Sequence, residues 1–180
     1  MITNQEAWAY FETKSWARSR DEVGDTLHEL ELADRTVDVL FDFRKLPKEY
    51  LLRASFSMST PRYLEVSAYI RGRRSGYHIV ASGKRLSQVE FDYSDLDDFS
   101  DFLINWAKDV DIEHELAQLC ALPTSAPGNR PIRHLAALAV TKDTETLKRY
   151  QRAFESGDRL GFVPYIKKDF IDRAVEAANG

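Results

Sequence analysis

Apolar and polar side chains alternate along one stretch of the sequence, Thr36-Val37-Asp38-Val39-Leu40-Phe41-Asp42-Phe43, with Leu40 as the single exception. Successive side chains of a β-strand point to opposite faces of the sheet, so every second residue lies on the same face. Val37, Val39, Phe41 and Phe43 would then form one continuous apolar face. This pattern predicts a strand with one buried side.

The same period of two recurs on both sides of this strand. We expect a hairpin partner at residues 27–32, further strands at 50–58 and 63–70, and two shorter strands within 79–91. The connecting segments are short, and short connections join antiparallel neighbours, because a parallel crossover needs a dozen or more residues. The sequence therefore predicts an antiparallel meander of five or six strands.

Helices are expected before and after this sheet. Thr3 and Glu6 have the spacing of a capping box, which predicts a helix near the N-terminus that ends in the charged stretch 15–24. Apolar residues return at helical spacing after Tyr93. The further helices are expected at 94–110, 112–122, from 131 onward, 143–156 and 164–178. The predicted fold class is α+β, with an N-terminal helix, an antiparallel five- to six-stranded meander sheet and a helical C-terminal half.

A proline-rich stretch divides the helical half. Residues 123–131 hold three of the six prolines of the chain, and so dense a run of proline cannot continue a helix. We therefore predict an α+β domain over residues 1–122 and a semi-rigid linker over 123–131. A helical subdomain over 132–180 is expected to pack on the first domain.

The composition points to a soluble cytoplasmic protein. A chain of 180 residues can bury a sizeable core without a disulfide. Its single cysteine, Cys120, excludes an internal disulfide and a Cys-x-x-Cys metal site. The first residues lack the basic and apolar regions of a secretory signal, and no apolar run approaches the roughly 20 residues that a membrane helix requires.

No pattern in the sequence predicts a reaction. His28, His78, His114 and His134 form none of the metal-binding or catalytic motifs, and the glycine motifs that bind phosphate are missing. We expect no cofactor and no metal, and a structural or surface role for each histidine. A small enzyme stays an alternative, because histidine and carboxylate groups can meet only in three dimensions. A pocket with two histidines beside carboxylates would favour that alternative.

Acidic residues are concentrated in one segment. The net charge of −4 comes from 25 basic and 29 acidic residues, but residues 90–115 hold ten acids against one base, Lys108. The rest of the chain is therefore net basic. Carboxylates in a first helical turn complement the helix dipole, which explains part of the cluster. A face that attracts a basic partner would explain the remainder. The predicted partner-binding residues are Asp92, Asp95, Asp97, Asp98, Asp101, Asp109, Asp111 and Glu113.

A second charged group is basic. Arg71, Arg73 and Arg74 surround Gly72 in an expected connection between two strands, at the same end of the meander as Arg44. They could bind an anion or an acidic protein surface there, although charges at a hairpin tip are often only solvated. The net acidity of the chain argues against direct binding of nucleic acid.

In size, acidity and the charge of its 90–115 segment, the chain resembles the small immunity proteins that bacteria make against their own secreted toxins. The resemblance implies a non-catalytic cytoplasmic protein, monomeric or homodimeric, that neutralises a cognate toxin by covering its active site. A toxin that acts on nucleic acid would have the basic cleft that an acidic face complements. A chaperone or adaptor for a secreted effector shares this size and build, but the helices after Pro131 are not expected of it.

Overall fold

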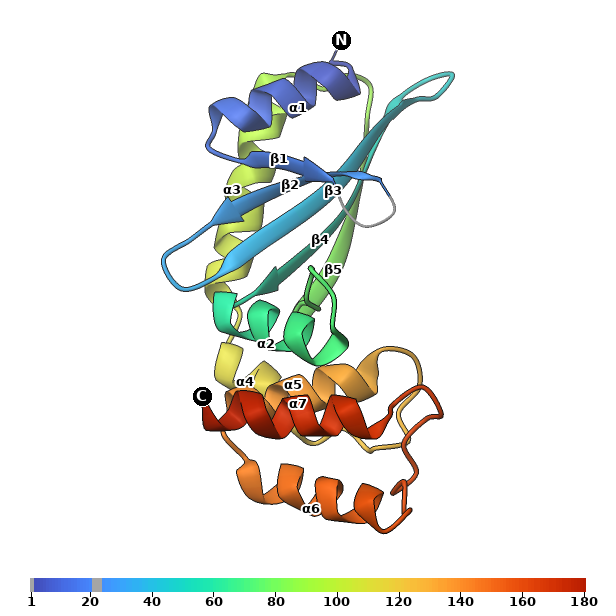
Figure 1. Ribbon diagram of the computed structural model, residues 1–180. Coiled ribbons are helices and arrows are strands. Elements are labelled where there is room, and N and C mark those ends of the chain that lie inside the picture. Colours follow the sequence, from blue (N-terminus) through green and yellow to red (C-terminus); the bar gives the residue numbers. More distant parts are fainter. Residues whose placement is uncertain (1, 21–23) are drawn as a thin grey trace. The chain divides into compact units, whose positions relative to one another are not determined.

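The structure is a computed structural model that describes residues 2–20 and 24–180. The described residues belong to two compact units. Unit 1 comprises residues 1–59 and 80–110, and unit 2 comprises residues 60–79 and 111–180. An N-terminal helix, an antiparallel sheet of five strands and a helical C-terminal half confirm the predicted α+β class (Figure 1).

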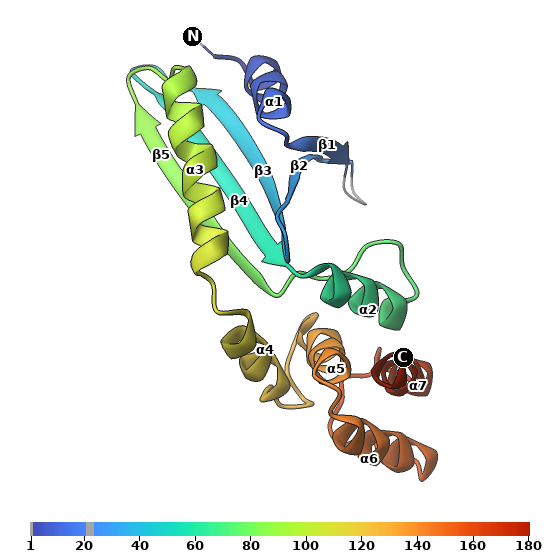
Figure 2. The ribbon, with the colours of Figure 1, turned by 90° about the vertical axis from the view of Figure 1, so that its left-hand side faces the viewer.

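Unit 1 is a five-stranded meander with two helices. Its strands lie in the order β1-β2-β3-β4-β5, and each neighbouring pair is antiparallel. Helix α3 runs along the sheet, and α1 lies near the end where α3 begins (Figure 2). The elements of unit 1 are α1 (Asn4–Thr13), β1 (Ala17–Arg20), β2 (Thr26–Glu31), β3 (Thr36–Lys45), β4 (Tyr50–Ser59), β5 (Val80–Gln88) and α3 (Tyr93–Asp109).

The core of unit 1 lies between the sheet and these two helices. As the alternation predicts, Val37, Val39, Phe41 and Phe43 of β3 are buried. The ring centroid of Phe11, on α1, lies 4.8 Å from that of Phe41. On the neighbouring strand β4, Phe56 meets Trp106 of α3 at 4.7 Å in an edge-on arrangement. Aromatic pairs of this kind join both helices to the same face of the sheet.

Unit 2 consists of helices. Its central helix is α5, in which the five consecutive residues 135–139 are all buried. Burial of so many consecutive residues is typical of a helix in the middle of a core. The hydroxyl of Tyr63 donates a hydrogen bond to the Arg133 carbonyl at 3.1 Å, which joins α2 to α5. The helices of unit 2 are α2 (Pro61–Arg71), α4 (Ile112–Cys120), α5 (Arg130–Val140), α6 (Thr144–Glu155) and α7 (Lys168–Asn179).

The strand expected at 63–70 is wrong, because this segment forms helix α2. The Thr60 hydroxyl caps its first turn by accepting a hydrogen bond from the Tyr63 amide at 3.2 Å, and Pro61 occupies the first turn. Gly72, at a φ of 64°, ends the helix in the left-handed conformation. The buried positions 63, 66, 67 and 70 follow helical spacing. A period of two and a period of 3.6 both fit this short segment, and the caps decide between them.

Two other details of the expected sheet need correction. Residues 80–88 form one strand, β5, where two were expected. Lys84 interrupts its apolar side, and the ammonium lies 3.7 Å from the centroid of the Phe102 ring. The charged stretch 15–24 contains strand β1, whose four residues are all exposed and therefore show no alternation. The expectation for residues 21–23 lies outside the described residues.

Residues 60–79 are an insertion in a β-hairpin. In the β4–β5 ladder Met58 pairs with Val80, so the two ends of the insertion are adjacent in space. The inserted helix α2 belongs to unit 2. Residues 123–131, expected to link two domains, lie inside unit 2 between α4 and α5. Within the described ranges, none of the helices has the length and apolar character needed to cross a bilayer.

Candidate protein-interaction surface on α3

Two of the predicted site residues begin helix α3. The Asp92 carboxylate accepts hydrogen bonds from the backbone amides of Ser94 and Asp95, at 2.8 and 3.2 Å. The Asp95 carboxylate in turn accepts from the Asp92 amide at 2.8 Å, which completes a capping box. The Ser94 hydroxyl and these amides hold the pKa of Asp92 below its ordinary value. Asp92 and Asp95 therefore stabilise the helix start.

Asp97 joins α3 to α1. It accepts a hydrogen bond from the Tyr10 hydroxyl at 2.9 Å and forms an ion pair with Lys14 at 2.8 Å. Lys14, followed by Tyr10, holds the pKa of Asp97 below its ordinary value. Both partners come from the same helix, so Asp97 has a positioning role within unit 1.

Three predicted site residues stay exposed on α3. Asp98, Asp101 and Asp109 are exposed, and none of them forms an ion pair or a hydrogen bond with another described side chain. Positions three and eleven residues apart lie on the same side of a helix. The opposite side of α3 is buried against the sheet through Leu96, Phe99 and Leu103. We call these three carboxylates the α3 acidic face.

The last two predicted acidic site residues belong to unit 2. Asp111 caps α4 by accepting a hydrogen bond from the His114 amide at 3.0 Å. Glu113 is exposed in the first turn of that helix, where its charge complements the helix dipole. The eight predicted residues thus fall into helix caps, one inter-helix pair and exposed carboxylates.

The basic group that was predicted in a strand connection lies at the end of α2. Arg71 donates a hydrogen bond to the Ser75 carbonyl at 2.6 Å, and its guanidinium lies 4.2 Å from the centroid of the Tyr77 ring. Arg73 and Arg74 are exposed after Gly72. The placement in a strand connection beside Arg44 is wrong, because Arg44 pairs with Leu51 near the start of β4 whereas α2 follows the end of that strand.

The histidines occupy separate environments. His28 lies in the core of unit 1, and the other three belong to unit 2. His78, expected in a strand, lies in the loop before β5. His134 is buried beside Tyr150, whereas exposed His114 lies 2.6 Å from the amide nitrogen of Gln118. Among residues 2–20 and 24–180, no group of three or more metal-ligating side chains comes together.

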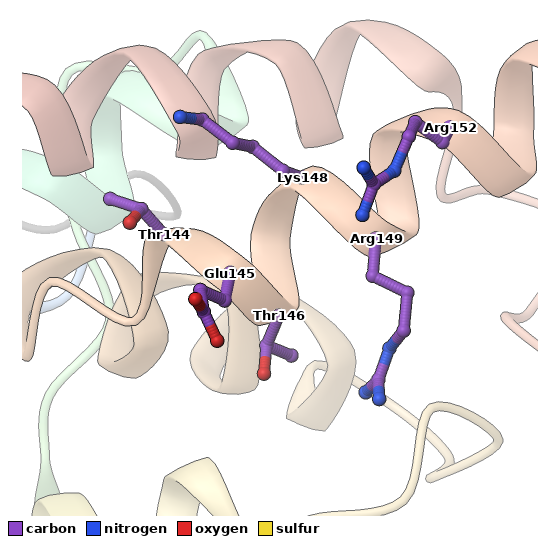
Figure 3. Close-up of a pocket in the computed structure, with 6 residues that line it drawn as sticks. All are labelled: Thr144, Glu145, Thr146, Lys148, Arg149 and Arg152. Atoms are coloured by element: carbon purple, nitrogen blue, oxygen red, sulfur yellow. The ribbon is translucent and has the colours of Figure 1, made fainter.

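Sequence reasoning missed a second charged surface, on helix α6. Lys148, Arg149 and Arg152 are exposed and line a surface hollow of about 620 Å³ (Figure 3). The spacing of Lys148 and Arg152 is the signal that could have indicated it, because residues four apart share a helix face. We call the exposed surface that carries all three cations the α6 basic face.

Fold and surfaces together define an α+β protein with a meander sheet, a separate helical unit and exposed charged helix faces. The chain belongs to a family described as "Family of unknown function (DUF6990)", whose profile matches residues 3–179. No curated protein matches the chain significantly, and no solved structure does.

Proposed function

We propose that this protein is a non-catalytic binding module that docks a basic surface of another protein on the α3 acidic face. The observation that carries the proposal is that Asp98, Asp101 and Asp109 remain exposed and unpaired after the other carboxylates of α3 are assigned to caps and to Lys14. Helix stability does not require these three residues, because they lie beyond the capped first turn.

The charge of the whole unit supports the same proposal. Unit 1 contains 18 acidic and 11 basic residues, a net charge of −7. Unit 2 contains 11 acidic and 14 basic residues, a net charge of +3. A concentrated negative potential accelerates the encounter with a positive surface and disfavours negatively charged partners. The small net charge of the chain therefore hides one strongly acidic unit.

The kind of partner follows from the resemblance to bacterial immunity proteins. We propose a cytoplasmic protein, monomeric or homodimeric, that neutralises a cognate toxin by covering a basic active-site cleft. A cleft that binds nucleic acid has this charge, because it must attract phosphates. In this proposal the protein does not bind nucleic acid itself. Its carboxylates occupy the partner's basic cleft in place of the phosphates of the nucleic acid.

The two alternatives have less support. A chaperone for a secreted effector is expected to expose an apolar groove, but the large apolar side chains exposed in the described part of the chain are only Tyr69, Val89, Tyr93 and Tyr165. They are shared between the two units. An enzyme would be favoured by two histidines in one pocket, and the hollow on α6 has none among its lining residues.

Co-purification tests the proposal. The tagged full-length chain is used as bait in cells of its source organism, and the captured proteins are identified by mass spectrometry. We expect a basic toxin, and we expect D98K/D101K to lower its association rate at least tenfold at low salt, because steering depends on these charges. E31K/E49K, with one change in β2 and one between β3 and β4, changes the net charge equally without altering α3 and serves as the control.

The two variants give a clear decision. Equal association rates for D98K/D101K and the unaltered chain would overturn the α3 assignment. Capture of an intact secreted substrate without toxic activity would favour the adaptor. Capture of no partner by a bait that is folded by circular dichroism would overturn the binding-module proposal.

A further inference from the structure

The cations of the α6 basic face have no carboxylate partner within the described part of the chain. Lys148, Arg149 and Arg152 form no ion pair with a described carboxylate, although Arg149 lies 5.5 Å from the ring of its neighbour Tyr150. The other side of α6 is buried in the core of unit 2 through Leu147 and Tyr150. The helix is therefore held in place by its apolar side while its cations stay available.

The three cations spread over a surface instead of converging on a point. Lys148 and Arg152 extend along one side of α6 and Arg149 along the other (Figure 3). All six residues that line the hollow come from this one helix, and Glu145 is among them. A small anion would need donors that point at one position. An extended acidic surface fits the arrangement better.

A protein surface fits better than a nucleic acid. None of the exposed large apolar side chains in the described residues is on α6, so the helix offers no aromatic platform on which bases could stack. Unit 1 of the same chain has a net charge of −7, which repels a polyanion. The partner is therefore expected to carry its carboxylates on a limited surface.

The α3 acidic face has the charge that the α6 basic face requires, and the two faces have similar spacings. Asp98 and Asp101 are about 4.5 Å apart along α3, and Lys148 and Arg152, which share one side of α6, are about 6 Å apart along that helix (Figure 3). We infer that α6 of one copy docks on α3 of a second copy of the chain. A reciprocal pair of such contacts closes a dimer. Exposed ion pairs are weak and screened by salt, so this association is expected only at low ionic strength.

This inference goes beyond the proposed function, because it needs no toxin. It also has a consequence for that function. A second copy would occupy the α3 acidic face, so self-association and a basic partner would compete for the same carboxylates. A variant of α6 would then dissociate the dimer and leave partner binding intact.

Sedimentation velocity on the full chain tests the contact. We expect the average mass to rise with protein concentration at about 50 mM salt and to stay monomeric at about 500 mM, where the Debye length falls severalfold. K148E/R149E/R152E and D98K/D101K/D109K should each raise the dissociation constant at least tenfold. R74E/R130E/K167E changes the same net charge at other exposed positions of unit 2 and is the control.

An equimolar mixture of the two reversed variants provides the decisive measurement. In D98K/D101K/D109K the α3 and α6 faces are both positive, and in K148E/R149E/R152E they are both negative. Each contact between the two variants therefore joins a positive face to a negative one. We expect the dissociation constant of the mixture to return to within about threefold of the original value. This recovery would also show that both variants are folded.

Three results would overturn the inference. One is the absence of concentration-dependent association at low salt. Another is a rise in the dissociation constant of the R74E/R130E/K167E control that equals the rise in K148E/R149E/R152E. The third is a mixture that stays monomeric although both variants unfold at the original temperature. Binding of a DNA duplex that is lost in K148E/R149E/R152E would instead assign α6 to nucleic acid. In each case the toxin capture with D98K/D101K remains an independent test of the proposed function.

Discussion

Each unit buries one histidine, and the two side chains differ in their hydrogen bonds. The ring of His28 stacks on Phe41 at 5.2 Å, and neither ring nitrogen has a hydrogen-bond partner in the described structure. The ring of His134 has a polar neighbour at each nitrogen, the Leu119 carbonyl and the Tyr150 hydroxyl, both at 3.0 Å. This arrangement assigns the proton to Nδ1 and makes Nε2 the acceptor for Tyr150. Burial lowers the pKa of both histidines.

The first prediction concerns the pH dependence of stability at His28. The ordinary pKa of histidine is 6.5, and burial places that of folded His28 below it, with Arg18 acting in the same direction. Between the two pKa values the unfolded chain binds more protons. The free energy of unfolding is therefore not reduced by His28 above about pH 6.5, and it falls as the pH drops toward the pKa of the folded state. H28F should reduce this loss, as measured by urea unfolding at pH 7.5 and 5.0.

Exposed His114 supplies the control for this experiment. H114Q removes an imidazole in unit 2 and leaves the surroundings of His28 in unit 1 unchanged, so it should retain the difference in stability that His28 causes between pH 7.5 and 5.0. At pH 7.5, H28F should be unchanged or more stable by about 1 kcal/mol, since an unpaired buried polar group is removed. The prediction would be contradicted if the free energy of unfolding fell equally between pH 7.5 and 5.0 in H28F and in the unaltered chain.

The second prediction concerns the hydroxyl of Tyr150. Y150F keeps the ring, which packs at 5.3 Å against Phe162, but leaves the buried Nε2 of His134 without its donor. We expect a loss of about 1–3 kcal/mol in the free energy of unfolding. Y165F removes a comparable hydroxyl, which donates to the Gly128 carbonyl at 2.5 Å from an exposed ring, and should cost less. Equal losses would show that burial of the acceptor has no influence.

At the scale of elements, helix α3 separates carboxylates that stabilise a fold from carboxylates that are free to bind. The capping box uses Asp92 and Asp95, and the contact with α1 uses Asp97. Asp98 and Asp101 follow directly but face solvent. All five lie within ten consecutive positions of the sequence, so charge density alone cannot distinguish their roles.

The third prediction tests this division. D92A should lower the free energy of unfolding by about 1 kcal/mol, because it removes the acceptor for two amides at the helix start. D92N should retain most of the stability, since asparagine caps helices as well as aspartate does. D98A should stay within about 0.5 kcal/mol of the original value. Chemical denaturation measures all three, and a D98A loss as large as that of D92A would contradict the assignment.

At the scale of the whole molecule, the chain passes between the two units at residues 59/60, 79/80 and 110/111. Neither unit is therefore a continuous segment of sequence. Because Met58 pairs with Val80, the sheet of unit 1 needs only a short turn in place of residues 60–79. Helix α2 instead packs in unit 2, where Tyr63, Val66 and Ile70 are fully buried.

The fourth prediction follows from this topology. A fragment that joins residues 1–58 to 80–110 through Asn-Gly, a favoured two-residue hairpin turn that keeps Met58 paired with Val80, should fold with an antiparallel sheet. A fragment of residues 1–122 should aggregate, because it keeps α2 without its partners α5 and α7 and so exposes the apolar side of α2. Circular dichroism and sedimentation distinguish the two. A monomeric, folded 1–122 fragment beside an unfolded joined fragment would contradict the division into units.

Local patterns predicted much of this structure, and their failures share one cause. The alternation around Phe41 and the capping box at Thr3 both predicted their elements correctly, because each depends on residues close in sequence. The segment around Val66 fits two periods, and its burial depends on distant helices. Strand β1 is exposed on both faces, so it is held by its ladder with β2 and leaves no hydrophobic pattern.

The sequence by itself determined the α+β class, the antiparallel meander around residues 36–45 and the concentration of acids in 90–115. These properties follow from side-chain periodicity, short connections and composition. Only the tertiary structure decided that 60–79 leaves the sheet for the helical unit, and that Asp98, Asp101 and Asp109 stay free while their neighbours are engaged. The physical reason is that burial and pairing depend on partners far along the chain, such as Tyr10 for Asp97 and Arg133 for Tyr63.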